Sequence, residues 1–363
     1  MSPPCEPSPA TDVAPPTTAA DAPLFDCDIH QGGLTKNEWL HYLDEPYRTE
    51  VAEAGLRVLS SGIRFEDGGI RWDASADHVS AVRTGLLDAY GTRIGILTGN
   101  NGPVAGVPDP DYVAALCRAI NNHALEQWTA HEPRLRMGIK IPLQDPALAV
   151  REIERLAGHP HVACVLFWGG AERIPFGQRY YWPIYEAAQR HHLPIHVHPS
   201  TTTGIAAHAT SAAGNLTTYL QTHVCLPQFY QAHLVSLVLE GVFEAFPRLK
   251  FLFVEGGFSW LPHVLWRMDK EYKGLRQQAP RLKRLPSDYM RDHVRLCQQP
   301  MEEPSSHAHL AQLLDMMGGP GMLCYASDYP HYDFDPPSVI PKSLGDRARR
   351  AILHDNAAAF FNL

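Results

Sequence analysis

His196 and His198 are separated by one residue at the end of a short apolar run, residues 193–199. Because successive side chains of a β-strand point to opposite faces, residues two apart project in the same direction. Both imidazoles would therefore face the space that this strand helps to enclose. A single histidine in such a place is more often a satisfied core residue than a ligand, but two of them at the carboxyl end of a strand favour a metal or catalytic site.

Three further apolar runs carry acidic or imidazole side chains: Asp26, Asp28 and His30 in residues 24–30, Glu255 in residues 250–257, and Asp328 in residues 322–330. Imidazole nitrogens suit Zn²⁺, and carboxylate oxygens widen the choice to harder ions such as Mn²⁺. We therefore expect a divalent metal ion, with Zn²⁺ as the first choice and Mn²⁺ as the second. The ion would keep an open position for water or a substrate oxygen.

Each of these residues also has an ordinary structural interpretation. Asp28 could cap backbone amides, Asp328 could be a turn residue before Tyr-Pro, and Glu255 could pair with a buried arginine. His196 could be a core residue or could support a ligand, so we leave it outside the expected metal ligands and assign it to substrate contact. Trp168 indicates a planar or apolar substrate, although an aromatic side chain there could equally pack at a rim.

Eight apolar runs alternate with helical patterns along the chain. We expect strands at residues 24–30, 93–99, 135–141, 161–169, 193–199, 250–257, 293–299 and 322–330. The helical patterns lie at residues 37–59, 75–90, 110–130, 146–158, 182–192, 233–246, 260–275, 306–317 and 346–363. This alternation implies parallel strands with crossover helices. Eight such units favour one closed (β/α)₈ barrel, an α/β fold in which the chemistry lies at the carboxyl ends of the strands.

The chain divides into a short tail and one large domain. Residues 1–23 are rich in Pro, Ala and Thr and are expected to be a disordered tail, and residues 24–363 form the single barrel domain. About 60 residues separate the first two strands, and this insertion, at about residues 31–92, is expected to be a lid or a substrate-binding segment. The loop at residues 200–221 would complete the substrate pocket.

The composition of the chain indicates which kinds of binding partner to expect. The chain has 363 residues, 45% of them hydrophobic, and a formal net charge of -8, so a basic nucleic-acid surface is not expected. The sequence contains no run of about 18 apolar residues, so we expect no membrane span. Seven scattered Cys without a CxxC pair indicate a reducing compartment, and we expect a cytoplasmic protein that acts on a small molecule.

Several stretches together resemble the amidohydrolase-related group of the amidohydrolase superfamily, which includes the aminocarboxymuconate semialdehyde decarboxylase-like enzymes. The stretches are DCDIH at 26–30, IHVHP at 195–199, residues 246–269, ASDYPH at 326–331 and the terminal DNAAAFFNL. The resemblance runs from about residue 24 to the C-terminus. It implies a distorted TIM barrel with a divalent metal at its mouth, and the family's frequent dimers make a homodimer one expected assembly.

Carried over to this chain, the family's metal ligands would be Asp28, His30, His198 and Asp328. Asp28 stands at the first position of the usual His-x-His pair, which resembles the acidic variants found in parts of the family. On the sixth strand the characterised decarboxylases carry a histidine thought to assist proton transfer. This chain has Glu255 followed by two glycines there.

Because a glutamate is a better general base for metal-bound water than a proton donor to carbon, the departure at Glu255 favours hydrolysis of an amide, ester or lactone of a small organic acid. Glu255 or Asp328 would accept the proton of that water, and His331 would orient the substrate or stabilise developing charge. The first alternative is non-oxidative decarboxylation of an aromatic or unsaturated acid. The second is a catalytically inactive barrel with a binding role.

Overall fold

The computed structural model describes residues 23–57, 78–99, 104, 107–169, 174–199, 214 and 216–363. Eight parallel strands form one sheet in sequence order, each hydrogen-bonded to the next. They are β1 (Leu24–Ile29), β2 (Thr92–Leu97), β3 (Leu135–Lys140), β4 (Val162–Gly169), β5 (Ile195–Pro199), β6 (Phe251–Phe253), β7 (Val294–Cys297) and β8 (Leu323–Cys324). All eight predicted strands are present, although the last three are shorter than expected.

The last strand closes against the first. Ile29 forms a parallel bridge with Tyr329, and the N–H of His30 donates to the carbonyl of Tyr329 at 2.9 Å. Three residues earlier on the first strand, the N–H of Cys27 donates to the carbonyl of Tyr325, also at 2.9 Å. These bonds join the two edge strands, so the predicted (β/α)₈ barrel is confirmed.

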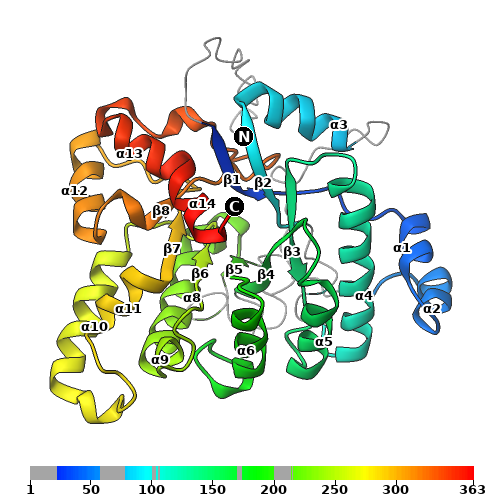
Figure 1. Ribbon diagram of the computed structural model, residues 1–363, viewed down its shortest axis with the longest axis horizontal. Helices are drawn as coiled ribbons and strands as arrows, with labels where there is room; N and C mark the ends of the chain where they lie inside the picture. The colour runs from blue at the N-terminus through cyan, green and yellow to red at the C-terminus, as the bar shows by residue number, and fades with distance from the viewer. Residues whose placement is uncertain are drawn as a thin grey trace, which may run out of the picture.

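Helices surround the barrel (Figure 1). The α-helices are α1 (Lys36–Tyr42), α2 (Tyr47–Ala54), α3 (His78–Val82), α4 (Pro110–His123), α5 (Pro146–Leu156), α6 (Trp182–Arg190), α8 (Tyr219–Leu239), α9 (Val242–Ala245), α10 (Leu261–Leu275), α11 (Pro286–His293), α12 (His307–Met317), α13 (Asp346–Arg350) and α14 (Asn356–Phe361). Helices α3, α4 and α13 continue into π-helical turns at Arg83–Asp88, Ala124–Thr129 and Ala351–Asp355. Short 3₁₀ turns lie at Arg179–Tyr181, Arg276–Gln278, Pro320–Met322, Pro337–Val339 and Lys342–Leu344.

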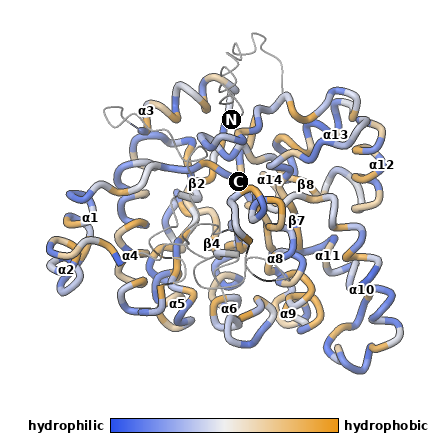
Figure 2. The backbone as a smooth tube through the Cα atoms, turned by 180° about the vertical axis from the view of Figure 1, so that it is seen from behind, coloured by the Kyte–Doolittle hydropathy of each residue, from blue (hydrophilic) through white to orange (hydrophobic). Residues whose placement is uncertain are grey.

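Local sequence signals explain where several helices begin. Asp109 and Asp145 each stand before a proline, and their carboxylates accept hydrogen bonds from the first free amides of α4 and α5. Thr35 and Glu38 form a reciprocal capping box at α1. In Figure 2 the outer helices alternate between hydrophilic and hydrophobic colour along their turns, as expected of helices with one face on a barrel.

Two helical predictions were wrong. Helix α8 begins at Tyr219 instead of His233, because Thr218 caps its first turn, and it continues through Pro227. The pattern at residues 37–59 forms α1 and α2 as separate helices with Pro46 between them. Helix α11, which directly precedes β7, was not predicted at all. Of the expected insertion at about 31–92, α1, α2 and α3 are described, whereas residues 58–77 lie outside the described part of the chain.

The predicted tail lies outside the described residues except for Pro23, and so does most of the loop at 200–221. Within the described ranges, no helix combines the length and the apolar character needed to cross a membrane.

Candidate metal centre

Three predicted ligands and Glu255 meet at the carboxyl end of the barrel. One ligand atom from each of Asp28, His30, His198 and Glu255 lies within 4.8 Å of the others. The Nε2 atoms of His30 and His198 are 3.2 Å apart. The Oε1 atom of Glu255 lies 3.6 Å from Nε2 of His198 and 3.9 Å from Nε2 of His30. All four side chains are buried.

Asp328 joins this cluster through His30. Its Oδ1 lies 3.0 Å from Nε2 of His30 and 2.6 Å from Nδ1 of His331. A second group with all ligand atoms within 4.8 Å contains His30, Glu255, Asp328 and His331. The structure therefore brings together every residue that the sequence predicted as a ligand or a catalytic group. It also places the carboxylate of Glu255 3.6 and 3.9 Å from the two predicted imidazole ligands, slightly farther than the 3.5 Å that separates Asp28 from each of them.

The ends of β6 and β8 hold their carboxylates in an unusual backbone conformation. Glu255 and Asp328 both adopt left-handed φ values, 56° and 58°. Such values cost a non-glycine residue about 1–3 kcal/mol and occur most often at functional sites. The turn after Glu255 needs glycine, because a Cβ on Gly256 would lie 2.0 Å from the ring of Tyr230. Gly257, with a φ of 62°, completes the turn.

On β1, neighbouring strands fix the carboxylates. The hydroxyl of Thr98 donates to Oδ1 of Asp28 at 2.5 Å, and the N–H of Asp328 donates to the carbonyl of Asp28 at 3.1 Å. Asp26, below Asp28, accepts hydrogen bonds from the amides of Asp28 and Ser327 at 3.1 and 2.9 Å. On the β8 side the amide of Gln299 donates to Oδ2 of Asp328 at 3.1 Å.

The two histidines of β5 occupy different levels of the barrel. Nδ1 of His198 lies 2.7 Å from the carbonyl of Pro199 and donates to it, which leaves the lone pair of Nε2 facing the cluster. Nε2 of His196 instead lies 2.9 Å from the carbonyl of Cys27, across the barrel interior. His196 belongs to neither ligand group and is fully buried, so it lies beneath the cluster, and its predicted substrate contact stays a prediction.

Burial and mutual repulsion act on the acids of the cluster. Burial, followed by the charge of Asp328, raises the pKa of Glu255, and burial raises the pKa of Asp328 to about 8. Asp28 behaves differently: although burial opposes it, the pull of His198 and His30 lowers the pKa of Asp28 well below its usual range. Three buried carboxylates at this spacing are stable together only with compensating positive charge.

The donor set fits a divalent metal ion. Ligand atoms about 2.1 Å from a tetrahedral ion lie roughly 3.4 Å apart, which resembles the spacing of the imidazole nitrogens and carboxylate oxygens here. Oδ2 of Asp28 lies 3.5 Å from Nε2 of His198 and is a buried acceptor with no hydrogen-bond partner among the described residues. Because buried acceptors are nearly always satisfied, this oxygen is suited to a cation.

Four groups near the cluster were not predicted from the sequence. Thr98 and Gln299 hold its carboxylates, and Lys140 of β3 lies beneath it. Tyr219 and Tyr332 form the fourth, an aromatic pair whose ring centroids are 6.4 Å apart. Burial, then nearby acids that include Glu255, raises the pKa of Tyr332 to about 12 and shifts that of Tyr219 in the same direction. Only Tyr332, next to the ASDYPH motif, carried a sequence signal.

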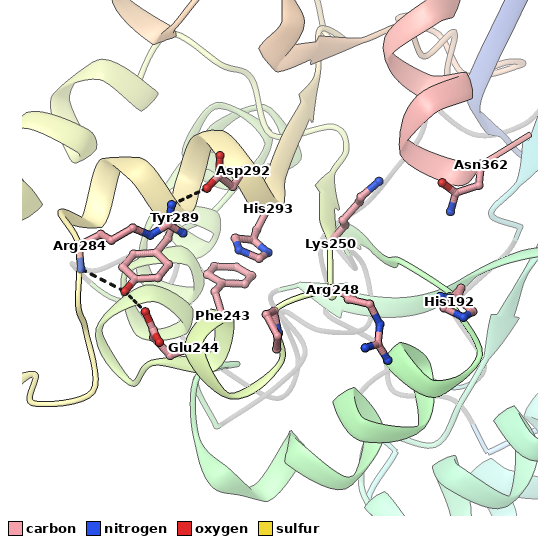
Figure 3. A pocket seen from close by; sticks show the side chains of 11 residues that line it. His192, Phe243, Glu244, Arg248, Lys250, Arg284, Tyr289, Asp292, His293 and Asn362 are labelled. Atoms are coloured by element: carbon pink, nitrogen blue, oxygen red, sulfur yellow. Dashed lines mark hydrogen bonds and ion pairs between the residues drawn. The ribbon is translucent and has the colours of Figure 1, made fainter.

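The described residues also form a pocket of about 510 Å³ at the opposite end of the barrel (Figure 3). Lys250 and His293, which precede β6 and β7, line it together with Arg284 and Asp292. Arg284 pairs with Asp292 at 2.6 Å, and Lys250 donates to the carbonyls that end α14. Because these groups lie at the amino ends of the strands, this pocket is separate from the metal centre.

Comparison with known proteins identifies the family. Residues 80–363 match the sequence model of the amidohydrolase family. A gamma-resorcylate decarboxylase from Polaromonas sp. is 25% identical over 293 residues, which make up 77% of this chain and 86% of that protein. The crystal structure of a 5-carboxyvanillate decarboxylase from Sphingomonas paucimobilis has a TM-score of 0.64 at 24% identity and covers 78% of this chain and 83% of its own. A dihydroxybenzoic acid decarboxylase from Polaromonas sp., with bound manganese and the inhibitor 2-nitroresorcinol, has a TM-score of 0.65 at 20% identity and covers 94% of this chain and 97% of its own.

These relatives overturn the predicted reaction. Hydrolysis was favoured because Glu255 stands where the characterised decarboxylases have a histidine, but curated relatives of this chain are named decarboxylases, so the hydrolase prediction was wrong. The cluster still contains a third imidazole, because Nδ1 of His331, beyond the end of β8, lies 3.8 Å from Oε1 of Glu255. The site therefore has an imidazole near Glu255, although the sixth strand itself carries a glutamate.

The family resemblance found in the motifs is confirmed, and the matched residues span β2 to β8 with most of the cluster. The chain belongs to the amidohydrolase family.

Proposed function

We propose that this chain is a metal-dependent, non-oxidative decarboxylase of a hydroxylated aromatic acid. The observation that carries the proposal is the cluster of three imidazoles and three carboxylates at the carboxyl end of the barrel, in which all but the half-buried His331 are buried. Support for the reaction comes from relatives named gamma-resorcylate decarboxylase, four of which match this chain. Support for the substrate class comes from neighbours crystallised with 2,6-dihydroxybenzoate or 2-nitroresorcinol.

Asp28, His30, His198 and Asp328 are the proposed metal ligands. We place Mn²⁺ ahead of Zn²⁺, because half of this donor set is carboxylate and a neighbour of the same fold contains manganese. When bound, the ion supplies positive charge for the substrate carboxylate and an adjacent hydroxyl oxygen. Glu255 stays close enough to the imidazoles to hold a bound proton or to complete the ligand set.

Aromatic side chains beside the cluster suit a planar ring. Trp168 stands level with His198 on the neighbouring strand, with the two ring centroids 6.1 Å apart. Its Nε1 is buried and has no hydrogen-bond partner among the described residues. Because a buried indole N–H usually finds an acceptor, we assign this donor to an oxygen of the substrate. Tyr219 and Tyr332 would cover the other side of the ring.

The reaction exchanges a carboxylate for a proton at one ring carbon. The bond between that carbon and the carboxylate breaks, carbon dioxide leaves, and the electron pair of the bond stays on the ring carbon, where it forms a new C–H bond with a proton that the protein delivers. Asp328 and His331, joined by a hydrogen bond of 2.6 Å, are the proposed proton donors. His331 is less buried than Asp328, so it can return a proton from solvent to Asp328 after each turnover.

The test is incubation of the purified protein, loaded with Mn²⁺, with 2,6-dihydroxybenzoate and its 2,3-, 2,4- and 2,5-isomers. We expect stoichiometric carbon dioxide and dihydroxybenzene from at least one acid, and a loss of at least about 100-fold in kcat for Asp328→Asn. Asp292→Asn, in the pocket at the opposite end, is the matched control and should keep full activity. No carbon dioxide from any of these acids, with manganese bound, would refute the proposed reaction.

A further inference from the structure

A lysine lies inside the barrel directly beneath the metal centre. Lys140 is the last residue of β3, and only 1% of its surface is exposed. The strand register places it level with His196, one interior level below Trp168 and His198. Asn121 of α4 fixes its backbone, because the Asn121 side chain donates to the carbonyl of Lys140 and accepts from its N–H, both at 2.9 Å. The backbone of Lys140, from which the ammonium group extends, is therefore fixed within the barrel.

On one side the ammonium group contacts Thr98, the residue that holds the carboxylate of Asp28. Nζ of Lys140 donates to the carbonyl of Thr98 at 2.5 Å. The hydroxyl of the same threonine donates to Oδ1 of Asp28, also at 2.5 Å. Thr98 is fully buried, so its two bonds fix its backbone and its side chain together. Lys140 and Asp28 are thus linked through a single residue.

On the other side the ammonium lies against an aromatic ring. Nζ of Lys140 is 4.6 Å from the centre of the Trp168 ring, a cation–π contact that a buried site strengthens. Trp168 in turn packs edge-on against the imidazole of His198. The lysine therefore touches the immediate supports of two proposed ligands, one from β1 and one from β5.

A charge at this place costs folding free energy. Burial lowers the pKa of Lys140 to about 7, which shows how strongly the surroundings oppose the ammonium form. A methionine of similar length would fill the same volume without that cost, and such replacements of buried charges are often neutral or stabilising. A role in packing alone therefore does not explain a lysine here.

We infer that Lys140 is a positioning residue of the metal centre. Through Thr98 it fixes the carboxylate of Asp28, and through Trp168 it fixes the ring of His198. The inference rests on the metal site of the proposed function, but it concerns metal affinity and not the reaction. Residues that orient metal ligands in this way typically contribute about 10–100-fold to metal affinity.

The experiment compares Lys140→Met with Lys250→Met. Lys250 is a matched control, because it also donates to backbone carbonyls, those of Ala359 and Phe360, and lies 5.6 Å from the Phe360 ring, but in the pocket at the other end of the barrel (Figure 3). Metal-free protein is titrated with Mn²⁺, and free Mn²⁺ is followed by electron paramagnetic resonance. We expect the Kd to rise at least about tenfold for Lys140→Met and to stay within about twofold of wild type for Lys250→Met.

The same Kd for both variants would overturn the inference, because a lysine that only packs would not affect the metal. If Lys140→Met fails to fold, Thr98→Val tests the same linkage with the lysine in place, and an unchanged Kd in that variant also overturns it. A wild-type protein that binds no Mn²⁺ would instead refute the metal site of the proposed function. Binding without turnover in wild type would leave the inference about Lys140 standing and refute only the reaction.

Discussion

At the scale of single residues, the metal centre depends on which atom each side chain presents. The carbonyl of Pro199 takes the Nδ1 proton of His198, so Nε2 faces the cluster. Thr98 occupies one oxygen of Asp28 and leaves the other without a partner among the described residues. These choices prepare acceptors for a cation before it arrives, which is the usual benefit of hydrogen bonds to metal ligands.

The indole of Trp168 offers the most direct test of substrate contact. Replacing Trp168 with phenylalanine keeps an aromatic ring but removes an N–H donor that has no hydrogen-bond partner among the described residues. Because one hydrogen bond to a charged oxygen contributes about 1.5–3 kcal/mol, we expect KM for the preferred acid to rise at least about tenfold, with a smaller change in kcat. Trp266→Phe, at an exposed tryptophan of α10, is the control. Equal KM values in both variants would remove Trp168 from the substrate site.

The lowered pKa of Lys140 predicts a pH dependence of stability. Its folded-state pKa is about 7 and its ordinary value is 10.5, so between these values the unfolded chain holds a proton that the folded chain does not. The free energy of unfolding of metal-free wild type, relative to Lys140→Met, should therefore rise from pH 7 to pH 10, by at most about 1.4 kcal/mol per pH unit. Urea unfolding of both proteins measures this difference. A flat difference would mean that the amine keeps its ordinary pKa.

The sequence revealed only part of the centre. Asp28, His30 and His198 could be found because strand alternation and the position of strand ends are local properties. Thr98 and Lys140 could not, because their roles depend on which strands lie side by side, and a lysine in a sequence ordinarily indicates the surface.

At the scale of elements, the strands were easier to predict than the helices. Apolar runs bounded by polar residues identified all eight strands, because most residues of these strands are buried. Helix α8 was placed too late, since its first half shows no clear polar face and contains Pro227. The turn after β6 was noted for Glu255, but the reason for its first glycine, the closeness of Gly256 to the ring of Tyr230, is a tertiary contact.

That turn yields a prediction about stability. Gly256→Ala would place a Cβ 2.0 Å from the ring of Tyr230 and should lower the free energy of unfolding by about 1–3 kcal/mol, because the ring or the end of β6 has to move. Gly274→Ala is the matched control: it lies near the end of α10 with nothing within 4 Å, and it should raise stability by up to about 1 kcal/mol. Chemical denaturation distinguishes the two. An unchanged free energy of unfolding in Gly256→Ala would show that the contact can be relieved without cost.

At the scale of the whole molecule, the barrel and the family could be predicted from motifs spread over the chain, whereas the reaction could not. One fold and one metal site serve several reactions, so the choice between hydrolysis and decarboxylation depends on a few side chains. From the sequence, the choice between the two reactions depended on Glu255 alone. The structure places His331 and Asp328, both also expected at the site, in the same group as Glu255, so an imidazole lies near the proposed proton donor.

The central claim is that distant strands bring acids and imidazoles together to hold one divalent ion on which decarboxylation depends. The most direct measurement is titration of metal-free protein with Mn²⁺ while carbon dioxide release from the preferred hydroxybenzoate is recorded. We expect that release rises in proportion to bound Mn²⁺ and saturates at a single ion per chain. Carbon dioxide release at full rate from the metal-free protein, or a fully loaded protein that releases none, would contradict it.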